Sequence, residues 1–427
     1  MVTVFGVMFR GTRGGSATRK DLTYTQNISI ERKESSLREC GNQSPPPHKP
    51  FILCTQNDSV NFTIIESSAD FKHLSTFNHP KNIKDFDHLF PKLTHKTIPD
   101  DIDIESNKTF IFPLLALQVS VFPGHGVCIG ITFCHLMDGI SCTHFMNFWS
   151  LIHRRGDGVE LKPPPCFDRD ILKDPKRLEE VFSSYYFSNR KTWKDKSIVG
   201  SKTSEEYVKA ITVFEKEEIE KMKRWVLSKW IKDDEEITAA PQFLSKFVVT
   251  CGFVWAIMIK TMYRNDDNDD ERIENFFFAG NCRENLGYPI PEGYFGNCLA
   301  LHHASLKRKD MKGENGFLNA VKVIEKAVTE MKNEPFKDAD EWMVKYIKMF
   351  EIGNIFSVRG SPKFNVYEID FGFGKPVKVE TMHSSRVMSL AESRDEEDGL
   401  EVGLVFKIEE YEYFCSLREQ GLATFTF

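Results

Sequence analysis

Hydrophobic positions follow two different periods from Phe51 onward, and they predict a mixture of strands and helices. Apolar runs and alternating patterns predict strands over residues 61–66, 114–122, 127–133, 208–214, 276–279, 366–371 and 401–408. Apolar residues at helical spacing predict helices from about residue 140 and over residues 215–230, 243–262 and 317–331. Strands and helices mix without strict alternation and without an internal repeat, so the pattern predicts an α/β fold with mixed sheets.

Two predicted helices have a clear apolar face. The helix from about residue 140 follows a predicted hairpin of strands 114–122 and 127–133, which ends at His135. Its expected apolar face consists of Phe145, Phe148, Trp149 and Ile152. The helix at 215–230 is expected to bury Ile219, Met222, Val226 and Trp230.

The pattern divides the chain into two halves. Residues 1–50 show little sustained periodicity and end in Ser-Pro-Pro-Pro at 44–47, so we expect little regular structure there. The basic, acid-free stretch before Asp21 weakly resembles an organelle transit peptide, but we favour a poorly ordered tail. The predicted division is a first domain at 51–185, a crossover segment at 186–207 and a second domain at 208–427.

Composition excludes several classes of function. The net charge of the 427 residues is −6, so no basic field indicates nucleic acid, and a small-molecule substrate fits better. No apolar run is long enough to span a membrane. The 10 cysteines form no CxxC pair and no Cys/His ligand spacing, which predicts reduced thiols, a cytosolic chain and no metal site.

His135 is the first candidate for chemistry. A histidine at a strand end is often only a satisfied polar residue. Here it leaves an apolar run, which should lower its pKa and keep the imidazole neutral, and Asp138-Gly139 then allows a sharp turn into the helix. A neutral histidine can deprotonate a hydroxyl at physiological pH.

Two further segments carry turn and charge signals. Residues 370–376 read Asp-Phe-Gly-Phe-Gly-Lys-Pro, where Gly372 and Gly374 indicate a tight turn. Asp-Phe-Gly also occurs in protein kinases, but the kinase catalytic loop, strand lysine and glycine-rich loop are missing. Arg283, in the stretch Gly-Asn-Cys-Arg, needs a carboxylate partner if it is buried, and Asp138 and Asp370 are the candidates.

Together these segments resemble the plant BAHD acyltransferases. That family carries HxxxDG in its first half and DFGWG in its second, which correspond here to residues 135–139 and 370–374. The stretch Tyr-Phe-Gly-Asn-Cys at 294–298 resembles the signature of the clade that acts on anthocyanin and flavonoid glycosides. Residues 247–251, 360–362 and 392–397 are also similar to that clade, so the likeness extends from about residue 50 to the C-terminus.

The resemblance implies a fold and a reaction. The fold is the two-domain chloramphenicol-acetyltransferase-like fold, with an active-site channel between the domains. The reaction transfers a malonyl or hydroxycinnamoyl group from an acyl-CoA co-substrate to a hydroxyl of a flavonoid or anthocyanin glycoside. The family works without a bound cofactor or metal and usually as a monomer.

The resemblance also implies roles for individual residues. His135 is the general base, and Asp370 belongs to the second catalytic motif, although a turn-shaping role suits it better than proton transfer. Asp138 pairs with Arg283 and supports the site, as do Gly372 and Gly374. The acyl-CoA binds near Ser245, Lys246 and Phe373, where Phe373 replaces the tryptophan of DFGWG.

The histidine motif is one residue shorter than in the family. Only Leu136 and Met137 separate His135 from Asp138, and counting back four residues from Asp138 reaches Cys134 instead. One deleted residue turns the two sides of a helix by about 100° and shifts them by ~1.5 Å. Our hypothesis is that the strand sets the register and that His135 still faces the channel. The alternative is a catalytically impaired relative that keeps a ligand-binding or interaction role.

Overall fold

The computed structural model describes residues 2–11, 60–93, 114–156, 159–160, 162–188, 207–232, 240–265 and 270–425. The strands are β1 (Val2–Arg10), β2 (Asn61–Glu66), β3 (Lys81–Asn82), β4 (Leu115–Phe122), β5 (Gly126–Cys134), β6 (Tyr207–Phe214), β7 (Ile273–Asn281), β8 (Leu299–Lys307), β9 (Ile355–Arg359), β10 (Lys378–Thr381), β11 (Val387–Glu392) and β12 (Leu400–Lys407). The α-helices are α1 (Phe71–Ser75), α2 (Gly139–Arg155), α3 (Leu178–Ser188), α5 (Lys216–Lys232), α6 (Lys246–Met262), α7 (Arg308–Lys312), α8 (Gly316–Asn333), α9 (Trp342–Ile352) and α10 (Ile408–Ala423). Short 3₁₀ helices are η1 (Ile83–Leu89), η2 (Ala339–Glu341) and η3 (Val366–Glu368).

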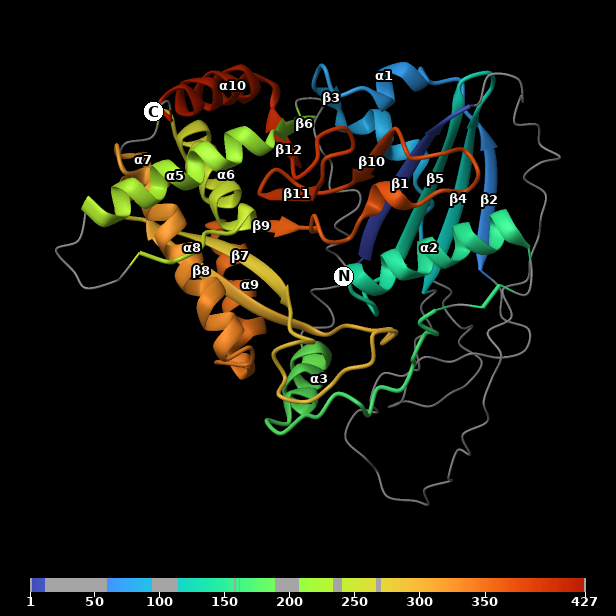
Figure 1. The fold of residues 1–427 in the computed structure, drawn as a ribbon, viewed down its shortest axis with the longest axis horizontal. Helices are drawn as coiled ribbons and strands as arrows, with labels where there is room; N and C mark the ends of the chain where they lie inside the picture. The colour runs from blue at the N-terminus through green and yellow to red at the C-terminus, as the bar shows by residue number, and fades with distance from the viewer. Residues whose placement is uncertain are drawn as a thin grey trace.

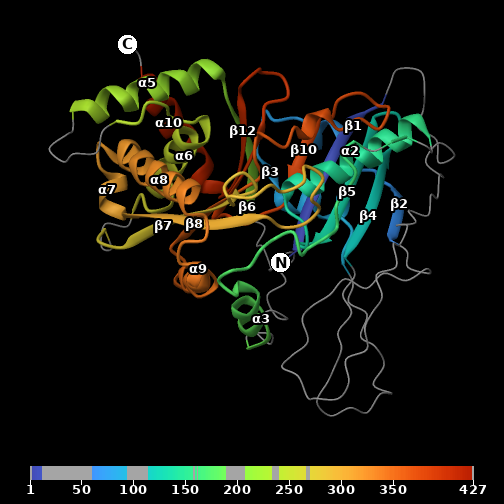
Figure 2. The same cartoon turned by 60° about the horizontal axis from the view of Figure 1, so that its bottom comes forward.

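The strands form two mixed sheets, which confirms the predicted α/β class. One sheet has the order β10-β1-β5-β4-β2, and the other has the order β3-β6-β12-β11-β9-β7-β8. The first sheet lies on one side of the molecule with α2 running across it, and the second lies on the other side with α5, α6 and α10 (Figure 1). Figure 2 shows α5, α6 and α8 on one side of β7 and β8 and α9 on the other.

The two sheets do not follow the two halves of the chain strictly. Strand β10, late in the sequence, pairs with β1 in the first sheet, with Phe5 opposite Thr381. Strand β3, from the first half, pairs with β6 in the second sheet, with Lys81 opposite Lys209. Each half of the chain therefore adds one strand to the sheet of the other, while the domain boundaries stay a prediction.

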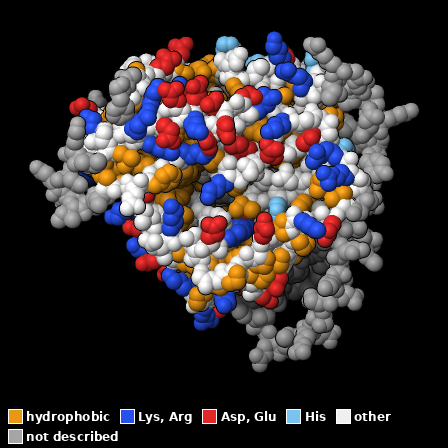
Figure 3. Space-filling view, viewed as in Figure 1, with side chains coloured by type: hydrophobic (Ala, Val, Ile, Leu, Met, Phe, Trp, Pro, Cys, Tyr) orange, Lys and Arg blue, Asp and Glu red, His pale blue; other side chains and the backbone are white. Residues whose placement is uncertain are grey.

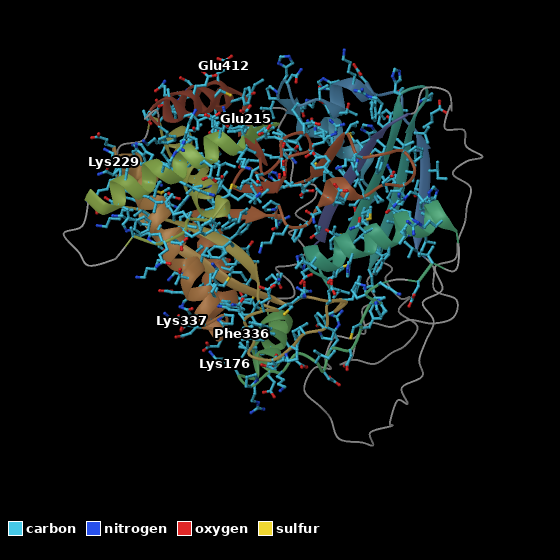
Figure 4. The ribbon with its side chains drawn as sticks, in the orientation of Figure 1. Lys176, Glu215, Lys229, Phe336, Lys337 and Glu412 are labelled. Carbon is cyan, nitrogen blue, oxygen red and sulfur yellow. The ribbon has the colours of Figure 1, made fainter. Side chains whose placement is uncertain are left out.

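Each sheet has its own apolar core. The core of the second sheet contains the predicted face of α5, since Ile219, Met222 and Val226 are at most 2% exposed. The core of the first sheet lies between its strands and α2. The segment before α3 also contacts the second half, because Lys176 Nζ donates to Phe336 O at 2.6 Å, near Lys337 (Figure 4). No helix among the described residues is long and apolar enough to cross a membrane.

The structure corrects the expectation for residues 1–50 where it describes them. Val2–Arg10 form β1, which lies between β5 and β10 and pairs with β5 over its whole length. Val7, Met8 and Phe9 are fully buried, so this segment belongs to the core rather than to a poorly ordered tail. Residues 12–59 lie outside the described residues, as does most of the predicted crossover segment.

Two other predictions are wrong in detail. The run at 366–371 was expected to be a strand, but Val366–Glu368 form a 3₁₀ turn because Asn365 adopts a left-handed conformation and the segment packs along α2. On α2, Phe148 and Ile152 are half-buried, whereas Cys142, Met146 and Ser150 are buried. The buried face of α2 is therefore rotated relative to the predicted one, although Phe145 and Trp149 still pack against the core.

Candidate active site

The β4–β5 hairpin delivers His135 to the start of α2. Pairing with both neighbours continues to the end of β5, with Phe133 opposite Leu115 and Cys134 opposite Val2. Leu136 N then donates to Cys134 O at 2.6 Å, so the chain turns directly after the strand. Pairing with two neighbouring strands therefore holds β5 in register up to the residue before His135.

Asp138 begins the helix and is held by three donors. Its Oδ1 accepts from Ser141 N at 3.0 Å as the N-cap of α2, and its Oδ2 accepts from Cys298 N at 3.1 Å. The same Oδ2 accepts from Arg283 Nη1 at 2.7 Å, and the aspartate side chain is 1% exposed. A carboxylate with this many donors and almost no access to solvent anchors the first turn of α2 to the second half of the chain.

The segment at 294–298 closes around the start of α2. Ser141 Oγ accepts from Gly296 N at 3.1 Å, and Asn297 Nδ2 donates to His135 O at 2.9 Å. Cys298 Sγ lies 3.6 Å from Cys282 Sγ, and both thiols are buried. The Tyr-Phe-Gly-Asn-Cys signature is therefore a structural clamp on the backbone around the candidate base.

The environment of His135 favours a neutral imidazole. Burial lowers the pKa of His135 below its usual value, and the positive charge of Arg359 adds to this shift. A hydrogen bond to the backbone of His135 itself and one to Asn297 act in the opposite direction but do not cancel it. The ring is half-buried, so it keeps partial access. In Figure 3 the surface is hollowed near its centre, between the region of β9 and the first turn of α2. A neutral, partly accessible histidine at this position can accept a proton.

Asp370 shapes the turn of the second motif. Its Oδ1 accepts from Gly372 N at 2.7 Å and from Gly374 N at 2.9 Å, and both glycines have positive φ, at 95° and 81°. Its Oδ2 lies 3.4 Å from Arg154 Nη1, near the C-terminal end of α2. Phe373 packs against Phe9 with 5.8 Å between ring centroids.

Helix α2 separates the two motifs. Asp138 caps its first turn, whereas Arg154, the partner of Asp370, lies near its last residue. At 1.5 Å per residue, the two ends are roughly 24 Å apart. Asp370 therefore lies at the far end of the helix from Asp138, where its contacts fit the expected turn-shaping role, while its place among the catalytic residues stays a prediction.

Ser245 and Lys246, the proposed acyl-CoA contacts, lie at the start of α6. Ser245 is the N-cap, and its Oγ accepts from Val248 N at 3.1 Å. Lys246 Nζ lies 3.6 Å from Asp398 Oδ1 and is partly exposed. The structure therefore brings His135, Asp138 and Arg283 together, keeps the residues of 370–374 as a second cluster, and places Ser245 and Lys246 in a third.

Sequence reasoning missed several residues of the site. Arg154 and Arg359 belong to no motif, and their roles depend on contacts between distant parts of the chain. Asn297 lies within a recognised motif, but its hydrogen bond to the His135 backbone spans 162 residues. Among the described residues, no group of three or more His, Cys, Asp or Glu side chains could hold a metal ion.

Comparison with known sequences gives strong matches. A model of the Transferase family matches residues 42–420. The chain is 32% identical over 400 residues to the Arabidopsis thaliana coumaroyl-CoA:anthocyanidin 3-O-glucoside-6''-O-coumaroyltransferase 1, covering 89% of this chain and 81% of that protein. It is 30% identical over 395 residues to the Dahlia pinnata malonyl-coenzyme A:anthocyanin 3-O-glucoside-6''-O-malonyltransferase, covering 88% and 80%.

Solved structures show the same fold. Vinorine synthase matches with a TM-score of 0.55 and 19% identity, over 82% of this chain and 73% of that one. TRI101 of F. sporotrichioides, complexed with coenzyme A and T-2, matches with a TM-score of 0.59 and 13% identity, over 97% and 93%. These likenesses confirm the two-sheet acyltransferase-like architecture that the sequence motifs imply.

Proposed function

Since this chain belongs to the BAHD acyltransferase family and is an acyltransferase, we propose that it transfers a malonyl or hydroxycinnamoyl group from coenzyme A to a hydroxyl of a flavonoid or anthocyanin glycoside. The relatives named above support this acceptor class, since both act on anthocyanin or anthocyanidin 3-O-glucosides by name. They use different donors by name, coumaroyl-CoA and malonyl-coenzyme A, so donor choice is a question for assay.

His135 is the proposed general base. Its neutral imidazole takes the proton of the acceptor hydroxyl, and the oxygen attacks the thioester carbonyl to form a tetrahedral intermediate. Collapse of the intermediate expels the coenzyme A thiolate, which regains a proton from the imidazolium. The observation that supports this assignment is that the Asp138 carboxylate already accepts hydrogen bonds from Ser141 N, Cys298 N and Arg283 Nη1. His135 is therefore the neighbouring group that can exchange a proton with the substrate.

The short histidine motif affects whether the protein can catalyse acyl transfer. Three residues, 135–137, connect a strand fixed by two neighbours to a helix fixed by the Asp138 cap. A one-residue deletion in such a link shortens the connection without moving either end, which supports His135 as the base. The shorter link also limits where the ring can point, and this favours the catalytically impaired relative as the second candidate.

An assay of the purified chain separates the two candidates. The protein is incubated with malonyl-CoA, coumaroyl-CoA and several flavonoid glycosides, and release of the coenzyme A thiol and formation of the acylated product are measured. Turnover that His135→Ala abolishes and Cys134→Ala leaves intact supports the enzyme with His135 as base. No turnover in the natural chain, restored when one alanine is inserted after Leu136, supports the impaired relative.

A further inference from the structure

Four charged side chains are buried together where the two sheets meet. They are Lys81 on β3, Lys209 on β6, and Lys378 and Glu380 on β10, and each is at most 4% exposed. Figure 1 shows these three strands close together between the sheets. The group carries three ammonium charges and one carboxylate, an excess of positive charge in a place with almost no solvent.

Lys81 uses two of its N–H groups on backbone carbonyls. Its Nζ donates to Thr76 O at 2.5 Å and to His79 O at 3.0 Å. An ammonium has three N–H groups. Within the described part of the chain, one N–H of Lys81 is therefore left for another acceptor.

Lys209 and Lys378 share Glu380, and each also has fewer oxygen acceptors than N–H groups. Lys209 Nζ contacts Glu380 Oε1 and donates to Thr381 O, while Lys378 Nζ lies 2.9 Å from Glu380 Oε2 and donates to Leu74 O at 2.9 Å. Each of these two ammonium groups also has two oxygen partners for three N–H groups among the described residues, and Lys378 Nζ lies in addition 4.6 Å from the centroid of the Phe86 ring. One carboxylate cannot neutralise both lysines and Lys81 as well.

A small cavity lies among these groups. Its volume is about 10 Å³, and it is lined by Thr76, Phe77, His79, Lys81, Lys209, Ile211, Lys378 and Glu380. A cavity of this kind accommodates about one water-sized particle. It is too small for a phosphate, a carboxylic acid or any part of the acyl-CoA.

The charges around the cavity repel one another. Burial and the positive charge of Lys378 together lower the pKa of Lys81 to about 8, although the negative charges of Glu380 and Asp85 act in the opposite direction. Uncompensated buried charge is costly, and a counter-ion offsets that cost.

We propose that this cavity binds one small monovalent anion of the size of chloride, held by the remaining N–H groups of Lys81, Lys209 and Lys378. The anion supplies the missing acceptor and brings the net charge of the group closer to zero. It thereby joins β3 and β6 of one sheet to β10 of the other and stabilises the junction between the sheets. This site is separate from His135 and from acyl transfer, and it concerns stability.

Thermal unfolding of the full chain tests the site. The protein is transferred to sodium gluconate, and chloride is titrated in at constant ionic strength. We expect the unfolding temperature to rise by about 2 °C and then saturate, because a ligand that binds only the folded state stabilises it by mass action. An unfolding temperature that is the same in gluconate and chloride would overturn the proposal.

Matched variants and bromide locate the effect. In Lys81→Met, chloride should no longer raise the unfolding temperature. In Lys72→Met, which changes an exposed lysine on α1, chloride should raise it as in the natural chain. Equal increments in both variants would overturn the site. If Lys81→Met does not fold, crystals of the natural chain grown in bromide decide the matter: an anomalous peak among the three Nζ atoms supports the site, and its absence there rejects it.

Discussion

Asp138 and Arg283 form a buried ion pair between residues 145 positions apart, with 2.7 Å between Oδ2 and Nη1. The pair connects the first turn of α2 to the end of β7, so it joins the two halves of the chain at the candidate base. The same carboxylate oxygen also accepts from Cys298 N, in the loop that leads into β8. The backbone around His135 is therefore held by a buried ion pair between the two halves of the chain.

Removal of Arg283 should destabilise the protein strongly. In Arg283→Ala, Asp138 stays buried at 1% exposure without its charged partner, and breaking such a pair costs about 3–5 kcal/mol. The free energy of unfolding in urea, measured for the natural chain and the variant, checks this value. Lys221→Ala is the matched control because Lys221 pairs with Glu217 on the exposed surface of α5, where loss of the pair should cost about 0.5 kcal/mol or less. Similar losses in both variants would contradict the anchoring role of Arg283.

The pH dependence of activity should report the neutral state of His135. Because burial and Arg359 lower the pKa of His135 below 6.5, the neutral base predominates at pH 7. We expect kcat/KM to be flat from pH 7 upward and to fall on acidification, with a midpoint below 6.5. His135→Gln should lower kcat/KM by about 10²–10⁴-fold and remove this acidic limb. His125→Gln, in the exposed turn between β4 and β5, should keep both the rate and the fall of kcat/KM at acidic pH. If that acidic fall persists in His135→Gln, His135 is not the base.

Local signals predicted the elements whose own residues show clear alternation or helical spacing. The β4–β5 hairpin, β2 and α5 appear where alternation and helical spacing place them. Strand β1 was missed although Val2–Arg10 is largely apolar, because Gly6 interrupts the run and the partners of the strand are far away in the sequence. The structure needs that glycine, since a Cβ there would lie 2.7 Å from the ring of Phe90.

The site could be predicted only as far as its motifs extend. The residues alone left Asp138 and Asp370 as alternative partners for Arg283, and only the resemblance favoured Asp138, where the structure places the guanidinium. The true partner of Asp370 is Arg154, 216 residues away, and no periodicity indicates such a contact. Electrostatic neighbours such as Arg359 depend on the packing of both sheets and leave no mark in local sequence.

The two glycines of residues 370–374 should resist substitution. Gly372 and Gly374 have φ values of 95° and 81°, in the region that disfavours residues with a Cβ, and their N–H groups both bind Asp370. Gly374→Ala should cost about 1–2 kcal/mol of stability, although no neighbouring atom lies within 4 Å of the new Cβ. Urea unfolding checks the loss, and Gly313→Ala, with φ of −63°, should stay within about 0.5 kcal/mol of the natural chain. A neutral Gly374→Ala would mean that the turn relaxes to a different backbone conformation.

Glu401 should make stability depend on pH through a buried carboxyl group. Burial raises the pKa of Glu401 to about 7, although the Tyr367 hydroxyl donates to its Oε2 at 2.5 Å and Arg394 N donates to its Oε1 at 3.0 Å. The folded state therefore favours the protonated form. The stability that the protonated carboxyl contributes is fully present below the pKa of glutamate in an unfolded chain, about 4.3. It is lost as the pH rises through the folded-state pKa of about 7.

Glu401→Gln tests this dependence because glutamine keeps the shape and stays neutral. The stability of the natural chain relative to the variant should fall by up to about 3 kcal/mol between pH 4.5 and pH 8, measured by urea unfolding at several pH values. Other titrating groups are common to both proteins and cancel in the difference. Glu409→Gln, on the exposed surface of α10, should give a difference that does not change with pH. If the difference in the free energy of unfolding between the natural chain and Glu401→Gln also does not change with pH, the carboxyl ionises as easily in the folded protein as in the unfolded chain.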